Sequence, residues 1–371
     1  MRDRGVIMEA NTSAYRGCLL GLAVGDAMGY TIDDKTLPEI RDNYGPNGLL
    51  GYDLQEAEYA VFTSYTQIAA YLSNALLLSV SRGKTDHMPF VRLSLREWTR
   101  SQQFYRDPEA SHCWIAKCPQ FRRRHCRDAR MLDNLRLEAY GTPENPKNDN
   151  NAPGAITSAV AVGMFYHHRR LTPEQVGSLA AQIIALTHGN PETFLSGVVL
   201  AYAIAGILQE PDHALAEQFS RAIDAMDGQF RSRFPLAEDL ARQLRSAMAL
   251  AQSHTVDGVE GMEQLECLDT AQCLAGAMFA CLRSPDDFDS AMITAVNHSG
   301  LSAAVGAITG AVLGARLGEE ALPEFYLESL DCADVLRTLA EDLAYGTPAT
   351  GLFDDAWDHK YVQGLPPEGM F

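Results

Sequence analysis

The stretch Arg16-Gly-Cys-Leu-Leu-Gly-Leu-Ala-Val-Gly-Asp-Ala-Met-Gly29 carries a glycine at every fourth position. The stretch Ala295-Val-Asn-His-Ser-Gly-Leu-Ser-Ala-Ala-Val-Gly-Ala-Ile-Thr-Gly-Ala-Val-Leu-Gly-Ala315, near the other end of the chain, has the same spacing. Residues four apart lie on one face of an α-helix, where each glycine costs about 1 kcal/mol relative to alanine. We therefore expect two helices whose glycine faces pack tightly into one core. The two ladders are Gly17, Gly21, Gly25 and Gly29, and Gly306, Gly310, Gly314 and Gly318.

Helical periodicity also dominates the sequence between the ladders. In residues 68–80, for example, Ala69, Leu72, Leu76 and Val80 fall on one side of a helix. Sustained alternation of apolar and polar residues, the pattern of a half-buried strand, does not occur. We therefore expect an all-α fold, a compact multi-helix bundle. Further helices are expected at residues 193–208, 212–226, 236–253 and 288–296, and loops or tails at 43–58, 141–153 and 347–371.

Two segments resemble helix starts. Thr172-Pro-Glu-Gln175 has the form of a capping box with proline in the first turn, which makes Thr172 the expected N-cap. Ser284-Pro-Asp-Asp287 repeats this design ahead of the helix expected at 288–296. The chain of 371 residues is long enough for two or three domains, but the ladders at its two ends belong to one bundle. We expect a single domain over 14–346, an N-terminal tail over 1–13, and a C-terminal tail over 347–371 that packs on or near the domain.

The ladders, together with Leu186-Thr-His-Gly-Asn-Pro191, resemble motifs of the ADP-ribosylglycohydrolase family in their order and spacing. The resemblance runs from about residue 14 to residue 343. It implies an orthogonal bundle of the ADP-ribosylglycohydrolase type. It also implies a site for two magnesium ions, built in active members from aspartates on two segments.

Those aspartates are replaced in this chain. Where the family reads Thr-Asp-Asp-Thr, the sequence is Thr63-Ser64-Tyr65-Thr66, and where it reads Gly-Asp-Thr-Asp-Thr, the sequence is Gly300-Leu301-Ser302-Ala303-Ala304. Magnesium prefers anionic oxygen ligands in near-octahedral geometry, and neutral hydroxyls and alkyl groups do not supply them. We expect no magnesium pair, no other metal at this site and no cofactor.

A third departure lies in the glycine-rich stretch that begins at Gly154, where Ser158 stands in place of the family's arginine. The glycines of the scaffold are kept, while the residues that the resemblance implies for catalysis and metal binding are replaced. This pattern is typical of a pseudoenzyme. We therefore expect a catalytically inactive protein that binds an ADP-ribose-like ligand, an ADP-ribosylated protein or an ADP-ribosyltransferase. An immunity protein against such a transferase is one form of this expectation. The expected binding pocket comprises Asp26, Thr63, Ser64, Tyr65, Thr66, Gly154, Ser158, His188, Asn297, Ser299, Leu301, Ser302 and Ala303.

Two other functions are compatible with the sequence. One is metal-independent or rewired hydrolysis of a glycosidic or ADP-ribosyl bond, for which Asp33 with Glu56 or Glu58 would supply the two carboxylates that such chemistry needs. The loop acids are equally explained as solvated surface groups, and Asp26 as a buttress of its helix. The other is a structural or oligomeric protein whose pocket is filled.

Two polar features beside the expected pocket also have two interpretations each. His188 is either a polar anchor near the pocket or a residue favoured by the dipole at a helix C-terminus. The turn formed by Asn297, His298 and Ser299 precedes the second glycine helix. That helix N-terminus would point free N–H groups at the old metal cavity, where an anion such as phosphate could bind.

Composition restricts the partners and the compartment. A net charge of −18, from 30 basic and 48 acidic residues, argues against nucleic acid and anionic membranes as partners. The polar first eleven residues do not form a signal peptide, and no segment reaches about 18 uninterrupted apolar residues. We expect a cytoplasmic protein.

Two clusters remain. His112, Cys113, Cys118, His125 and Cys126 could bind zinc, although they lack a Cys-x-x-Cys spacing, and buried reduced cysteines are the alternative. Residues 121–130 contain five arginines, which either hold a phosphate or an acidic partner or pair with neighbouring acids such as Asp128 and Asp133.

Overall fold

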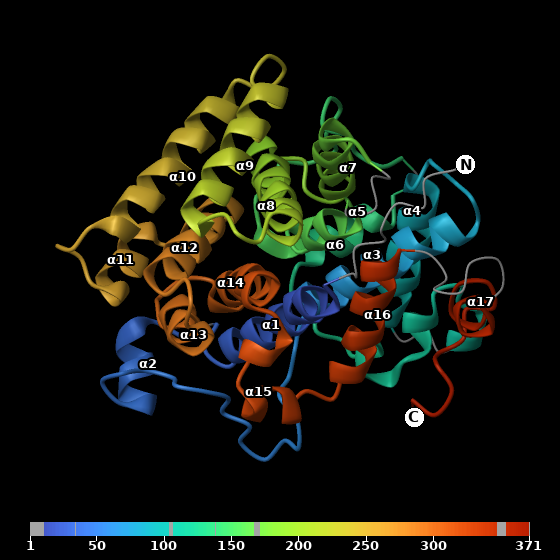
Figure 1. The fold of residues 1–371 in the computed structure, drawn as a ribbon, viewed down its shortest axis with the longest axis horizontal. Coiled ribbons are helices and arrows are strands. Elements are labelled where there is room, and N and C mark those ends of the chain that lie inside the picture. The colour runs from blue at the N-terminus through green and yellow to red at the C-terminus, as the bar shows by residue number, and fades with distance from the viewer. Residues whose placement is uncertain are drawn as a thin grey trace, which may run out of the picture.

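A computed structural model of the chain describes residues 11–33, 35–103, 107–137, 139–166, 171–346 and 354–370. Across these ranges the regular structure is helical, and extended pairing is limited to one isolated bridge between Thr142 and Asn145. The expectation of an all-α fold is confirmed (Figure 1). The α-helices are α1 (Thr12–Tyr30), α2 (Leu37–Tyr44), α3 (Ser64–Ser81), α4 (Met88–Ser101), α5 (Ala129–Leu135), α6 (Ser158–Phe165), α7 (Pro173–Ala185), α8 (Pro191–Gln209), α9 (Leu215–Phe230), α10 (Leu236–Gln252), α11 (Gly258–Leu265), α12 (Thr270–Arg283), α13 (Phe288–Val296), α14 (Ser302–Leu317), α15 (Glu324–Glu328), α16 (Ala333–Tyr345) and α17 (Asp355–Tyr361).

The two glycine ladders pack against each other as antiparallel helices at the centre of the molecule, where α1 and α14 lie side by side (Figure 1). A Cβ built on any of the paired glycines would lie under 3.0 Å from the backbone of the other helix, a distance that real Cβ atoms essentially never show. The ladders therefore allow the two backbones to touch. The pairs are Gly17 with Gly314, Gly21 with Gly310, Gly25 with Gly306, and Gly29 with Ser302.

The remaining helices surround this central pair. On one side α14 packs against α8, α12 and α13, while on the other α1 packs against α3 and α16. Helices α8 to α12 form one flank of the bundle in Figure 1, and α3, α4, α6 and α16 form much of the other. This arrangement brings the C-terminal end of α1 next to the N-terminal end of α14, because the two helices run in opposite directions.

Helix starts agree with the sequence in one case and differ in another. Thr172 caps α7 as expected: its backbone N–H donates to Gln175 Oε1 (2.7 Å), and Gln175 N–H donates to Thr172 Oγ1 (3.3 Å). Ser284, expected to cap α13, instead ends α12. Asp287 is the N-cap of α13, accepting from Ser290 N–H at 3.0 Å, because its carboxylate lies at the point where the helix begins.

The C-terminal region is not all loop. Residues 347–353 lie outside the described part of the chain, as do residues 1–10 of the N-terminal tail, but α17 follows them. Trp357 Nε1 donates to Ser81 Oγ on α3 at 2.7 Å, and Lys360 Nζ donates to Asp342 Oδ2 on α16 at 2.5 Å. These contacts attach α17 to the bundle.

Among the described helices, α8 is the one long and apolar enough to cross a membrane by length and composition. In the structure, 78% of its apolar window is buried inside the protein. It packs against α6, α7 and α9. The burial of α8 is that of a core helix.

The contact between the ladders predicts the effect of adding a single methyl group. Gly310→Ala should lower the free energy of unfolding by about 2 kcal/mol or more, because its Cβ would overlap the carbonyl oxygen of Gly21. Gly228→Ala, in α9, is the matched control: its Cβ would meet nothing within 4 Å, so it should stabilise by about 0.5–1 kcal/mol. Urea unfolding of both variants measures the difference, and equal stability would contradict the close contact.

Candidate functional site

Asp26, on α1, fixes the start of α3. Its carboxylate accepts four hydrogen bonds, from the backbone N–H of Thr63 (2.8 Å) and Thr66 (3.0 Å) and from their hydroxyls (2.7 and 2.6 Å). Complete burial raises the pKa of Asp26 to about 6, although the four hydrogen bonds act in the opposite direction. Asp26 is therefore the buttress of the segment in which the family places its first two aspartates.

A cavity of about 410 Å³ opens in front of this segment. Five segments converge at this cavity: the end of α1, the starts of α3, α5 and α14, and the stretch ahead of α6. Six of the thirteen expected pocket residues line it, together with Asp33, so segments far apart in sequence meet at one cavity. The lining residues are Tyr30, Asp33, Thr63, Ser64, Tyr65, His125, Arg127, Asp128, Ala129, Arg130, Ala152, Pro153, Gly154, Leu301 and Ala303.

Other expected pocket residues lie behind the cavity wall and support it. Ser158 is buried and donates its hydroxyl to the Ala155 carbonyl at 2.6 Å. Ser302 donates its hydroxyl to the Val296 carbonyl at 2.7 Å. Thr66 is occupied by Asp26. These hydroxyls complete the local backbone and do not line the cavity.

The turn before α14 also serves the scaffold. Asn297 Oδ1 accepts from Leu49 N–H at 2.7 Å, and its amide donates to the Leu49 carbonyl at 2.9 Å. Ser299 Oγ accepts from Leu37 N–H at 2.9 Å. The turn therefore holds the loop around α2. Glu56 is exposed and does not line the cavity.

Asp33 occupies the N-terminus of α14. Its Oδ1 accepts from Ala303 N–H at 2.8 Å, and its Oδ2 lies 3.8 Å from Arg127 Nη1. The sequence led us to expect free N–H groups there for an external anion. That expectation is wrong for Ala303, because the carboxylate of Asp33 takes the place of the anion.

Asp128 is the acidic residue that the sequence analysis missed as part of the pocket. It caps α5 by accepting from Met131 N–H at 3.0 Å, and its Oδ2 lies 2.9 Å from Asn150 Nδ2 and 3.0 Å from His188 Nε2. Burial alone would raise the pKa of Asp128, but the hydrogen bond and charge of His188, with those of Met131 and Asn150, bring it to about 2. Asp128 is therefore ionised.

His188 holds Asp128 from inside the core. It is fully buried, and its Nδ1 lies 2.7 Å from Thr187 Oγ1. Gly154 packs against the pair: a Cβ there would lie 3.2 Å from Asp128 Oδ2 and 3.3 Å from His188 Nε2. His188 thus contacts a residue of the cavity wall, as the anchor interpretation requires. Sequence spacing alone does not reveal its partner.

Tyr65 places a phenol in the cavity wall, at a position where the resemblance implies a carboxylate in active relatives. Burial, followed by the charge of Asp33 and then smaller contributions including those of Asp26 and Asp128, raises the pKa of Tyr65 well above its usual value. The phenol therefore stays protonated at neutral pH. It can donate a hydrogen bond to a ligand, but it cannot serve as an anionic metal ligand.

The donor set does not fit a pair of magnesium ions. Ser64 and Thr63 offer neutral hydroxyls, and Leu301 and Ala303 offer alkyl groups. Within the described ranges, no group of three or more His, Cys, Asp or Glu side chains is arranged to hold a metal ion.

The cysteine and histidine cluster has structural surroundings. His112 Nδ1 lies 3.2 Å from Glu97 Oε1, while Cys113 and Cys118 are buried. Cys126 is half-buried, and burial first of all raises the pKa of its thiol to about 11. All eight cysteines are free thiols. The arrangement resembles the buried reduced set and not a zinc site.

The arginine cluster divides between two roles. Arg123 forms an ion pair with Asp331, remote in sequence. Arg127 and Arg130 instead line the cavity, and the guanidinium of Arg127 lies 4.8 Å from the centre of the Tyr30 ring. Two cations therefore reach the same pocket as Asp128. The basic run in the sequence was a usable signal, but which arginines face the pocket depends on how the loop before α5 folds.

Comparison with known proteins gives one family. A match to the family described as ADP-ribosylglycohydrolase spans residues 8–351. An uncharacterized protein of Archaeoglobus fulgidus is 25% identical over 336 residues, which cover 89% of this chain and 95% of that protein. A solved structure described as an ADP-ribosylglycohydrolase-related protein complex superposes with a TM-score of 0.56 at 23% identity, covering 91% of this chain and 99% of that one. The structural likeness shows the fold.

The environment of Asp128 predicts a pH-dependent contribution to stability. Its pKa is lower in the folded protein than in the unfolded chain, so the stabilisation is present above about pH 4 and is lost as the pH falls towards about 2. Asp128→Asn should lower the free energy of unfolding by about 1–2 kcal/mol at neutral pH, after allowance for partial exposure, and by less in acid. Urea titrations over this pH range measure the difference.

Asp133→Asn is the matched control for that experiment. Asp133 lies on the same helix and pairs with Arg136 at 2.7 Å in an exposed position, so its loss should cost less than about 0.5 kcal/mol. A pH-independent effect of Asp128→Asn would contradict the lowered pKa of Asp128.

Proposed function

This chain belongs to the ADP-ribosylglycohydrolase family, and from that membership we propose that it is a catalytically inactive member that acts by binding an ADP-ribose-like ligand. One observation carries the proposal. The four positions that hold the family's aspartates are Ser64, Tyr65, Leu301 and Ala303, and all four line one cavity. The pocket is kept while the ligands for its metals are replaced.

The cavity has features suited to such a ligand. Its volume of about 410 Å³ lies within the usual range for small-molecule sites. Arg127 and Arg130 lie at its wall and suit a diphosphate, because guanidinium groups form charge-assisted hydrogen bonds with phosphate oxygens. Apolar Leu301, Ala303 and Pro153 provide surface for the uncharged parts of the ligand.

The same residues are poorly suited to hydrolysis. Metal ions in such sites lower the barrier by holding a water molecule and stabilising charge, and each effect contributes several kcal/mol. The two carboxylates of the cavity are engaged in the scaffold: Asp33 caps α14, and Asp128 caps α5 and pairs with His188. With a pKa of about 2, Asp128 is also ionised and unable to act as a general acid near neutral pH.

Metal-independent hydrolysis is the second candidate function. It is favoured by one observation, namely that Asp33 and Asp128 line the same cavity. Glu56, the partner first considered for Asp33, lies on an exposed loop outside the cavity. A rewired glycosidase would therefore use Asp33 with Asp128.

The ligand could reach this pocket as part of a protein. An ADP-ribosylated protein presents the same chemical group, and an ADP-ribosyltransferase is the enzyme that attaches it. Either would fit an immunity role in the cytoplasm. The net charge of −18 favours a basic partner. A pull-down from native cytosol with the wild-type protein and Arg130→Ala as paired baits identifies which of the two is bound.

Binding of ADP-ribose should be independent of magnesium. Calorimetry with ADP-ribose should give the same dissociation constant in millimolar magnesium and in a chelator, and magnesium alone should produce no specific heat. Arg130→Ala should weaken binding roughly tenfold through loss of a charge-assisted hydrogen bond. Lys35→Ala is the control cation outside this cavity. Magnesium-dependent binding would contradict the proposal.

The wild-type protein should not release ADP-ribose from ADP-ribosyl-arginine or ADP-ribosyl-serine above background. Chromatography of the reaction mixture measures the release. If the wild type cleaves either substrate and Asp33→Asn abolishes the cleavage, the second candidate function replaces the first. Combined restoration of Ser64→Asp, Tyr65→Asp, Leu301→Asp and Ala303→Asp should introduce magnesium binding that the wild type lacks.

A further inference from the structure

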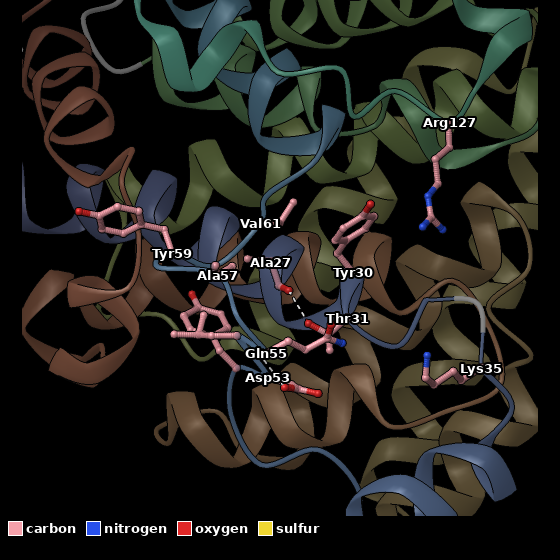
Figure 2. A pocket seen from close by; sticks show the side chains of 13 residues that line it. Ala27, Tyr30, Thr31, Lys35, Asp53, Gln55, Ala57, Tyr59, Val61 and Arg127 are labelled. Atoms are coloured by element: carbon pink, nitrogen blue, oxygen red, sulfur yellow. Dashed lines mark hydrogen bonds between the residues drawn. The ribbon is translucent and has the colours of Figure 1, made fainter.

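A second cavity of about 330 Å³ lies beside the first. It is formed by the last turn of α1 and by the loop over residues 52–61, and it shares Tyr30 and Arg127 with the first cavity (Figure 2). None of the positions that correspond to the family's metal ligands lines it. Its lining residues are Ala27, Tyr30, Thr31, Lys35, Tyr52, Asp53, Leu54, Gln55, Ala57, Tyr59, Ala60, Val61 and Arg127.

One end of this second cavity is cationic. Figure 2 shows the side chains of Arg127 and Lys35 at the same end, directed towards each other across the opening. Arg127 is oriented by the Tyr30 ring, 4.8 Å away, and by Asp33 at 3.8 Å. Two cations that face one space attract an anion between them, and a phosphate offers oxygens to both.

Tyrosine rings make up part of the remaining wall of this cavity. Tyr30, Tyr52 and Tyr59 all line the cavity. The hydroxyl oxygen of Tyr52 is buried, out of reach of a ligand in the cavity. Its ring is held edge-on against Tyr326 at 5.1 Å between ring centres. A ligand with an aromatic group would cover the parts of these rings that line the cavity.

The loop that closes the cavity is held in one shape. Asp53 Oδ2 accepts from the Tyr44 hydroxyl at 2.8 Å, and its Oδ1 accepts from Gln55 N–H at 3.1 Å. Gln55 has φ 51°, a left-handed conformation that is unfavourable for a residue with a side chain. Ala60 N–H donates to the Ser329 carbonyl at 2.8 Å. Strain held by surrounding contacts is typical of preorganised ligand sites.

We propose that this second cavity binds a phosphate monoester of an aromatic compound, of the nucleoside monophosphate class. The phosphate lies between Lys35 and Arg127, and the base lies against Tyr52 and Tyr59. The cavity is large enough for one such molecule. The carboxylate of Asp53 already accepts hydrogen bonds from the Tyr44 hydroxyl and from Gln55 N–H, so it faces the loop and not the phosphate. This inference does not depend on the function proposed for the first cavity.

Calorimetry of the full chain with AMP tests the proposal, with adenosine and inorganic phosphate as partial ligands. AMP should bind with a submillimolar dissociation constant, and each partial ligand at least about tenfold more weakly, because each lacks one of the two contacts. Lys35→Ala should weaken AMP binding about tenfold, while Arg130→Ala, which lines only the first cavity, should leave it unchanged. Lys35 and Arg130 are not core residues, and matching thermal midpoints check that both variants fold.

Competition with ADP-ribose distinguishes the two cavities. In the Arg130→Ala variant, the affinity for AMP should stay the same while the affinity for ADP-ribose falls. Three results would overturn the proposal. The first is no saturable heat with AMP, and the second is AMP binding that Lys35→Ala does not change. The third is loss of AMP binding in Arg130→Ala while Lys35→Ala binds AMP like the wild type. The last result would place AMP in the first cavity and leave the function proposed there intact.

Discussion

Direct contact between the backbones of α1 and α14 is the constraint on which the rest of the structure depends. Glycine on both helices removes the Cβ atoms that would otherwise keep the axes apart, and a Cβ at Gly21 or Gly310 would overlap the opposite carbonyl. Because the helices are antiparallel, the contact brings the end of α1, with Tyr30 and Asp33, to the start of α14. The packing of the central pair therefore forms the pocket. This packing does not depend on which side chains line the pocket.

The polar groups that remain near the pocket are those that the scaffold needs. Asp26 accepts four hydrogen bonds from the start of α3, and Asp33 caps α14 through Ala303 N–H. Asp128 caps α5 and is held by buried His188. Loss of any of these carboxylates would leave buried backbone donors without partners, a cost of about 1–3 kcal/mol each.

Tyr30 and Arg127 separate the two cavities while belonging to both. The guanidinium lies over the ring at 4.8 Å and near Asp33 at 3.8 Å. A ligand that draws Arg127 towards one cavity would weaken its contact with the other, since one guanidinium cannot make the best geometry with two anions at once. Tyr30 and Arg127 are therefore the residues through which a ligand in one cavity would affect the other.

The sequence by itself determined the helical class, the tight pairing of the glycine ladders and the cap at Thr172, because each depends on residue type at fixed local spacing. It assigned the cap of α13 to Ser284 instead of Asp287, since both residues can cap and only the backbone path selects one. Tertiary structure alone decided that Asp128 meets His188, that Asp33 fills the start of α14, and that Arg127 faces two cavities. Those contacts join residues far apart in sequence, and their geometry is set by how loops cross the finished bundle, which local periodicity does not encode.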